Sequence, residues 1–206
     1  MLYSDGAGAT IVEAETSEEP VGILSHSTRS DTLDEAYMLW MDKSYNSEHD
    51  ESELYLKMHG RKLYEYALKT VPQVVEESIE KAGLILNDVH KVLIHQANEK
   101  MDEAILKRLY ALYGKDEVAQ NVMPMSISWL GNSSVATVPT LLDLLYKAKL
   151  GDHISNVGNI LVFASVGAGA LRISSHSSKP SCVKMVSTAA SLSLSCFCLP
   201  TGMKLK

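Results

Sequence analysis

Apolar side chains recur at helical spacing over residues 63–82, and Gly83 follows where such a run would end. Spacings of three and four residues place these side chains on one face of a helix, and glycine commonly follows a helix C-terminus. Pro72 lies inside the run, where it is expected to cost one hydrogen bond and bend the helix. The same spacing predicts a second amphipathic helix over residues 101–112.

Two short apolar runs read as strands, residues 89–94 and residues 159–165. Residues 133–150 are apolar nearly all round at helical spacing, which predicts a buried central helix with Asn132 or Ser133 as its N-cap. Strands that are apolar throughout suit a sheet covered on both faces. The alternation therefore predicts an α/β fold, with a mixed, mostly parallel sheet between helices.

The pattern divides the chain into three parts. Residues 1–53 are expected to be the remnant of the end of a preceding half, with strand-like runs at residues 10–12 and 21–25. Residues 54–173 are expected to form the α/β domain. Residues 174–206 are rich in Ser and Cys and lack any period, so we expect this tail to be disordered.

Composition narrows the classes of function. The formal net charge of the 206 residues is -6, which argues against a nucleic-acid binder. No secretory signal and no spanning helix is visible, so we expect a cytoplasmic protein with no membrane contact. Cys182, Cys196 and Cys198 all lie in the tail and form neither a disulfide framework nor a metal-ligand spacing. A reducing compartment and no metal site follow as expectations.

Three places could carry chemistry, and each has a structural alternative. His95 follows a predicted strand, where open α/β sheets bind ligands, although a lone histidine there is more often structural. Asn132 precedes the predicted central helix, where it could simply be an N-cap. The turn Gly167-Ala168-Gly169 could be no more than a tight turn between strands. His90 would point to the other strand face from His95, which makes a two-histidine metal site implausible.

Taken together and in order, the motifs are more specific than any one alone. They are Asp5-Gly6-Ala7-Gly8-Ala9, Tyr55-Leu56-Lys57-Met58-His59-Gly60-Arg61, His95-Gln96-Ala97-Asn98, Gly131-Asn132-Ser133-Ser134 and Ala164-Ser165-Val166-Gly167-Ala168-Gly169. This series resembles the C-terminal half of 3-oxoacyl-acyl-carrier-protein synthase III. The resemblance runs from residue 1 to about residue 170.

The resemblance implies a thiolase-like fold, of which this chain would be the C-terminal half, with the N-terminal half missing. It implies a homodimeric acyltransferase that starts fatty-acid synthesis by condensing acyl-coenzyme A with malonyl-acyl-carrier protein. No cofactor is implied, because the coenzyme A thioester is itself a substrate. His95 and Asn132 match the His and Asn of the family's Cys-His-Asn triad.

Further roles come from the same resemblance. Gly167, Ala168 and Gly169 match the turn that forms an oxyanion hole, and Asn98 matches a residue associated with coenzyme A binding. The segment Gln96, Ala97, Asn98, Glu99 and Lys100 matches the carrier-protein docking segment, where Lys100 offers positive charge to an acidic partner.

The family nucleophile belongs to the N-terminal half, and the tail cysteines have no counterpart to it. We therefore expect the isolated chain to be inactive in condensation. Two alternatives remain open. The chain could be a non-catalytic remnant or subunit that binds coenzyme A or carrier protein. The parent enzyme could instead make a related Claisen product, as chalcone-synthase-like enzymes do, although the His-Gln-Ala-Asn motif favours the synthase.

Overall fold

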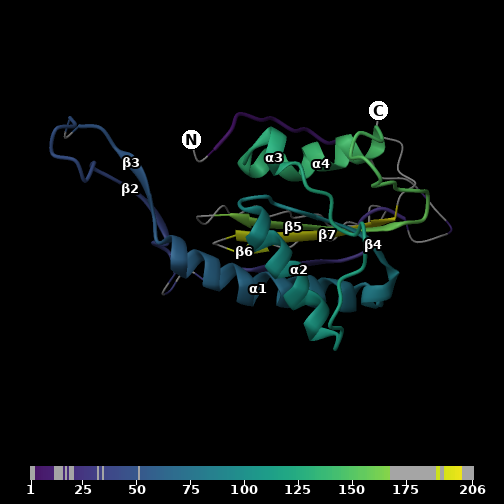
Figure 1. The fold of residues 1–206 in the computed structure, drawn as a ribbon. Coiled ribbons are helices and arrows are strands. Elements are labelled where there is room, and N and C mark those ends of the chain that lie inside the picture. Colours follow the sequence, from purple (N-terminus) through teal and green to yellow (C-terminus); the bar gives the residue numbers. More distant parts are fainter. Residues whose placement is uncertain are drawn as a thin grey trace.

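The computed structural model describes residues 3–11, 16, 18, 21–31, 33, 35–50, 52–167, 189–190 and 193–200. Its centre is a five-stranded sheet in which four strands have the order β1-β7-β5-β4. The fifth strand, β6, pairs with β5. The strands are β1 (His26–Arg29), β4 (Val89–Ile94), β5 (Ile160–Gly167), β6 (Ala189–Ala190) and β7 (Ser193–Pro200). Helices α1 (Gly60–Lys81) and α2 (Glu99–Leu112) lie on one side of the sheet. Helices α3 (Ile127–Leu130) and α4 (Thr137–Tyr146) lie on the other (Figure 1).

The expected α/β fold with helices on both faces is therefore present. β4 and β5 run parallel, with Leu93 opposite Phe163. Successive strand residues point to opposite faces, so Leu93 and Phe163 join the apolar cluster under α4. Val92 and Val162 join the cluster under α1 and α2. The two cores explain why residues 92–94 of β4 and residues 160–164 of β5 are apolar without alternation.

The sheet is less parallel than expected. β7 pairs antiparallel with β5 on one side and with β1 on the other, while β6 pairs parallel with β5. The antiparallel strand comes from the part of the chain expected to be disordered, so that expectation does not hold for residues 193–200. The tail does alternate locally between apolar and polar residues, as in Leu194-Ser195-Cys196, and this short pattern is typical of a strand.

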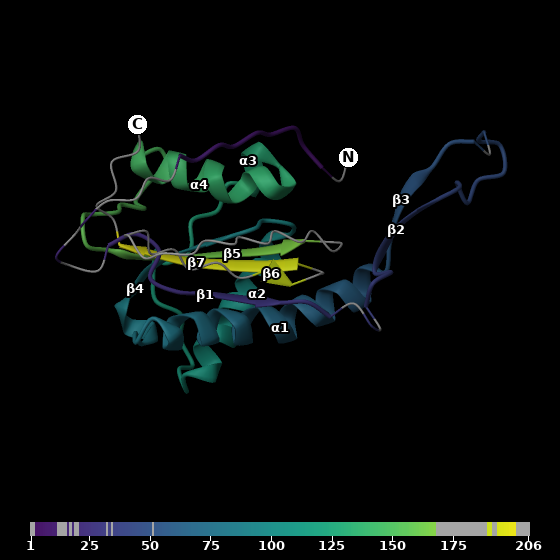
Figure 2. The ribbon, with the colours of Figure 1, turned by 180° about the vertical axis from the view of Figure 1, so that it is seen from behind.

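β2 (Leu39–Asp42) pairs with β3 (Tyr55–Met58) across the expected boundary at residues 53 and 54. The two strands form a hairpin that projects from the body in both views (Figures 1 and 2). The segment before it contributes β1 to the main sheet, where β1 pairs with β7, and Leu24 packs against the core beside α1. Of the described residues before position 54, residues 26–29 therefore belong to the main sheet, and residues 39–42 belong to the separate hairpin sheet.

Most helix predictions are confirmed, with adjusted ends. α1 continues through Pro72, and Gly83 at φ 72° follows it, where the Leu84 N–H bonds the Ile79 carbonyl oxygen. This 6→1 bond is the usual way a glycine ends a helix. α4 is shorter than the expected 133–150 and is buried on one face only, through Leu141, Leu142 and Leu145.

Local differences also affect the first residues. Thr10 and Ile11 form no strand, and the first strand begins at His26, after the expected 21–25. The N-terminal segment instead runs in extended form along α3 and α4 (Figure 1). A Cβ on Gly6 would lie 2.7 Å from that of Ser133, and one on Gly8 would overlap Pro139. The small residues of this segment therefore allow a close approach to the start of α4.

Candidate active site

His95 lies directly beyond the end of β4. Its backbone N–H donates to the carbonyl oxygen of Ala164 on β5 at 2.7 Å, which extends the pairing of the two strands by one residue. Its ring is half-buried, and Nδ1 lies 3.1 Å from the carbonyl oxygen of Ser134. The sheet therefore fixes the backbone of His95 and the Ser134 carbonyl fixes its ring.

The environment of His95 favours the neutral imidazole. Burial lowers the pKa of His95 and outweighs the hydrogen bond with the Ser134 carbonyl, which alone would raise it. A carbonyl oxygen can only accept, so Nδ1 carries the proton in this contact. In the neutral ring Nε2 then holds a lone pair and is the nitrogen left for a substrate atom.

Asn132 lies in the turn between α3 and α4. Gly131 precedes it at φ 71°. The backbone oxygen of Asn132 accepts a hydrogen bond from the N–H of Ser4 at 2.9 Å. The side chain is nearly buried, and its Oδ1 accepts from the N–H of Ser134 at 2.9 Å. This bond two residues along the chain forms an Asx-type turn just before the 3₁₀ turn η2 (Ser134–Ala136), whose N-cap position is Ser133. The side-chain cap of the central helix that was expected from Asn132 or Ser133 is absent from α4. The Nδ2 amide group remains able to donate.

Ser134 joins the two candidate residues. Its N–H binds the Asn132 side chain and its carbonyl oxygen binds the His95 ring. Ser134 has φ 53°, a left-handed conformation that is uncommon for a residue with a Cβ. The structure thus brings together two residues that are far apart in the sequence, and it does so through an unfavourable backbone conformation. Such conformations concentrate at functional sites.

The expected docking segment divides into a buried and an exposed part. Gln96 has no exposed surface, and its amide group is bonded inside the protein, so its side chain cannot contact a carrier protein in this structure. Asn98 accepts from the Met101 N–H at 3.2 Å as the N-cap of α2. Glu99 and Lys100 are exposed. Only the latter part of the segment is available at the surface.

The glycine turn is only partly described. Gly167 is the last residue of β5, two residues beyond the position where Ser165 pairs with Ser195. Ala168 and Gly169 lie outside the described residues. Cys196 and Cys198 lie in β7 opposite Ala164 and Val162.

Asp102 was not singled out from the sequence. Its side chain on α2 is fully buried, and neither carboxyl oxygen has a hydrogen-bond partner among the described residues. Burial, followed by the nearby charge of Glu99, raises the pKa of Asp102 to about 8. Its spacing from Ile105, Leu106 and Leu109 is the helical spacing of the buried face, which could have revealed it.

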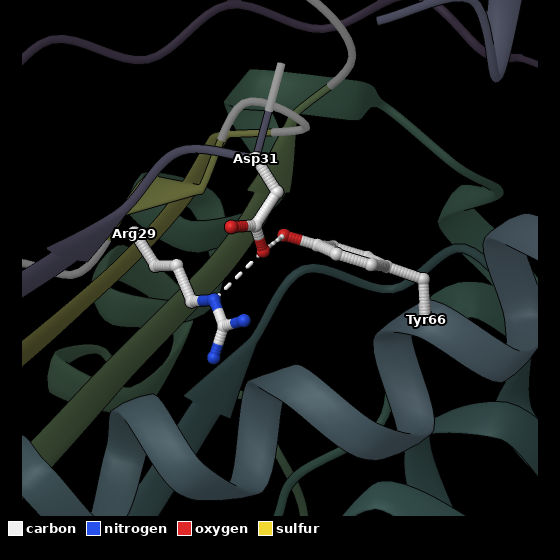
Figure 3. Close-up of polar contacts among 3 residues, drawn as sticks. All are labelled: Arg29, Asp31 and Tyr66. Carbon is white, nitrogen blue, oxygen red and sulfur yellow. Dashed lines mark hydrogen bonds and ion pairs between the residues drawn. The ribbon is translucent and has the colours of Figure 1, made fainter. Parts of the chain in front are cut away.

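A second polar cluster connects β1 to α1. Asp31 Oδ2 accepts from the Nε of Arg29 at 2.7 Å and from the hydroxyl of Tyr66 at 2.9 Å (Figure 3). Burial and the hydrogen bond to Asp31 raise the pKa of Tyr66. No sequence pattern points to this cluster, because Asp31 and Tyr66 are distant in the chain. It ties the strand to the helix beneath it.

Two further observations concern metals and membranes. In the described part of the chain, no three or more His, Cys, Asp or Glu side chains gather in a way that could hold a metal ion. Among the same residues, no helix has the length and apolarity needed to cross a membrane.

Known proteins support the assignment that the motifs suggest. The family model "3-Oxoacyl-[acyl-carrier-protein (ACP)] synthase III C terminal" matches residues 79–175. The beta-ketoacyl-acyl-carrier-protein synthase III of Clostridium novyi is 31% identical over 165 residues, which cover 77% of this chain and 48% of that protein. The same enzyme of Acaryochloris marina is 30% identical over 165 residues, with the same two shares.

Solved structures agree on the fold. The synthase III structure from Thermus thermophilus superposes with a TM-score of 0.65 at 21% identity, covering 91% of this chain and 48% of that one. The chain spans about half the length of the curated relatives it matches. On motifs, relatives and thiolase-like fold together, it belongs to the 3-oxoacyl-acyl-carrier-protein synthase III family and corresponds to the C-terminal half of such an enzyme.

Proposed function

We propose that this chain supplies His95 and Asn132 to a decarboxylative Claisen condensation of acyl-coenzyme A with malonyl-acyl-carrier protein. The observation that carries the proposal is the contact of both side chains with the backbone of Ser134. Among the residues that the structure describes, Nε2 of His95 and Nδ2 of Asn132 have no hydrogen-bond partner. In this proposal one substrate oxygen binds to both atoms.

Decarboxylation of a malonyl thioester requires hydrogen-bond donors such as His95 and Asn132 could supply. When malonyl thioester loses carbon dioxide, the bond between the carboxylate carbon and C2 breaks, and its electron pair moves onto the thioester oxygen as an enolate. Donors fixed in advance around that oxygen stabilise the charge as it develops. Asn132 Nδ2 is a neutral donor whose position is held by the bond from its Oδ1 to Ser134.

His95 requires a proton on Nε2 to donate as well. With Nδ1–H directed at Ser134, that means the doubly protonated ring, which burial disfavours before substrate binds. An anionic malonyl group beside the ring would favour the charged form, because opposite charges at short range raise a histidine pKa. Binding of the anionic substrate would therefore load His95 with the proton that the enolate oxygen needs.

The remaining family roles are proposals of the same kind. Gly167, Ala168 and Gly169 would form the second oxyanion hole, and the Nδ2 amide of Asn98 would contact coenzyme A. Glu99 and Lys100 would belong to the carrier-docking surface. The protein would act as a homodimer in the cytoplasm.

We further propose that these 206 residues alone are inactive in condensation. By resemblance the acyl-accepting cysteine belongs to the other half of the enzyme, so the enolate would have no acyl-cysteine to attack. A thiolate also needs a cationic neighbour or a helix N-terminus to react, and Cys196 and Cys198 lie within a strand.

The test is incubation of the purified chain with labelled acyl-coenzyme A and malonyl-acyl-carrier protein. The account predicts no acylated chain and no 3-oxoacyl product. Acylation of Cys182, Cys196 or Cys198 at one equivalent, followed by turnover, would show a complete active site and overturn the proposal. The alternative, a subunit that only binds carrier protein or coenzyme A, would bind its ligand without releasing carbon dioxide.

A further inference from the structure

We propose that Gln96 is a positioning residue that holds His95 against Asn132. It lies immediately after His95 and has no exposed surface. Its consequence for catalysis rests on the function proposed above, but the positioning itself is a statement about geometry. The argument begins with what the side chain bonds.

The Gln96 amide spans from the end of β4 to the segment before α3. Nε2 donates to the carbonyl oxygen of Pro124 at 2.8 Å. Oε1 accepts from the backbone N–H of Ser126 at 2.8 Å and from the Ser126 hydroxyl at 3.2 Å. Both ends of the amide are thus used, and Ser126 is itself buried.

The bonded segment is the one that carries Asn132. Ser126 is the N-cap position of α3, which is a single turn ending at Leu130, and Gly131 and Asn132 follow at once. The backbone oxygen of Ser126 also accepts from the Leu130 N–H at 2.9 Å. Because only this short helix separates the anchored residue from Asn132, a shift of Ser126 would be passed on to the turn that holds Asn132.

On the other side, Gln96 is joined by one peptide bond to His95, whose N–H is paired with Ala164. Gln96 therefore connects the two supports of the site independently of the Ser134 contact. Glutamine suits this place because it presents a donor and an acceptor on one rigid group, matching a carbonyl and an N–H. A buried side chain of the same length without these atoms would leave Pro124 and Ser126 unpaired.

The experiment uses the full chain and needs no substrate. Gln96→Met keeps the length of the side chain and removes all three bonds. Nitrogen-15 NMR of the His95 ring is expected to show one tautomer, with the proton on Nδ1, in the unmodified chain. In the variant we expect a mixture of tautomers and a rise in the His95 pKa, since a loosened ring is better solvated.

Thr70→Val is the matched control, because Thr70 is equally buried but lies on α1, which covers the opposite side of the sheet from α4. It should leave the His95 signals unchanged. If Gln96→Met also leaves both tautomer and pKa unchanged, Gln96 only stabilises the fold and the proposal is wrong. Should Gln96→Met not fold, Ser126→Ala, which removes the Ser126 hydroxyl bond alone, decides: a small change in the same direction supports the proposal, and an unchanged ring rejects it.

A kinetic readout ties the positioning to the reaction. In malonyl decarboxylation, Gln96→Met should lower kcat about tenfold while KM changes less than about twofold, because misplacement affects the transition state more than binding. If Gln96→Met changes the tautomer and pKa of His95 but the unmodified chain has no activity, the proposed function is contradicted and the positioning role is supported. If the unmodified chain is active but Gln96→Met leaves the His95 ring unchanged, the positioning role is contradicted and the proposed function is supported.

Discussion

His95 and Asn132 bind opposite ends of one residue, since the ring of His95 contacts the carbonyl oxygen of Ser134 at 3.1 Å and the side chain of Asn132 contacts its N–H at 2.9 Å. The two contacts fix both side chains relative to each other. They also decide which atoms remain for a substrate. A change in the Ser134 conformation would therefore move both groups at once.

The N-terminal segment supports this arrangement at Gly6. In Gly6→Ala the new Cβ would lie 2.7 Å from Ser133 and 3.1 Å from Ala136, so the segment or the turn beside Asn132 must shift. Overpacking of this kind costs about 1–3 kcal/mol. Urea denaturation of the variant should show a loss of that size.

Gly60→Ala provides the comparison. A Cβ there meets only Met58, at an ordinary 3.7 Å, and lies at the start of α1. Its unfolding free energy should change by less than about 1 kcal/mol, in the stabilising direction, because alanine is the better helix former. Equal losses in both variants would mean that the close approach at Gly6 contributes nothing.

Asp102 should make stability depend on pH. Its folded pKa of about 8 lies above that of an unfolded aspartate, so the folded chain binds the extra proton between those values. The contribution is fully present below the unfolded pKa, and it is lost as the pH rises through the folded pKa. Asp102→Asn removes the titration. The stability of the unmodified chain relative to this variant should fall by about 1.4 kcal/mol per pH unit between pH 5 and pH 7.5.

Denaturant titrations of both proteins at several pH values provide the measurement. Glu99→Gln should weaken the dependence slightly, because the charge of Glu99 adds to the effect of burial. A difference between Asp102→Asn and the unmodified chain that stays constant with pH would mean that the carboxyl is ionised inside the fold.

The cluster of Figure 3 predicts the opposite pH dependence. Burial alone would raise the pKa of Asp31, but the hydrogen bonds from Tyr66 and Arg29 outweigh it and leave the pKa lowered. Tyr66→Phe should cost about 0.5–1 kcal/mol at neutral pH. That loss should shrink as the pH falls through the folded pKa of Asp31, since the protonated carboxyl no longer favours the bond.

Tyr64→Phe is the control on the same helix, because Tyr64 is exposed. In thermal unfolding at pH 7, the Tm of Tyr64→Phe should equal that of the unmodified chain. If the two tyrosine variants lose the same stability at every pH, the Asp31 contact does not stabilise the fold.

Much of the fold could be predicted from local pattern alone. The run at 89–94 coincides with β4, and Gly83 follows the helix that it was expected to end. The pairing of β7 between β1 and β5 could not be predicted in this way, because the register joins segments far apart in the sequence. The single-sided burial of α4 also depends on what packs against it, which periodicity does not contain.

For the site, the sequence indicated which residues matter but not how they are held. His95 and Asn132 were chosen from motifs, whereas the conformation of Ser134 that joins them is a tertiary property. The resemblance to the family places Gln96 in the docking segment. Its burial follows from the path of residues 124–126, to which no sequence signal pointed.

The central claim is that His95 and Asn132 stabilise an enolate, and release of carbon dioxide from labelled malonyl-acyl-carrier protein tests it most directly. The full chain should release carbon dioxide slowly and without condensation product, more slowly as the pH rises, since Nε2 of His95 must carry a proton to donate. His95→Ala and Asn132→Ala should each lower the rate by about 10²- to 10³-fold, the usual cost of one oxyanion donor. Thr70→Val should release carbon dioxide at the same rate as the unmodified chain. Release that is equally fast in all four proteins, or absent from the unmodified chain although it binds malonyl-acyl-carrier protein, would contradict the account.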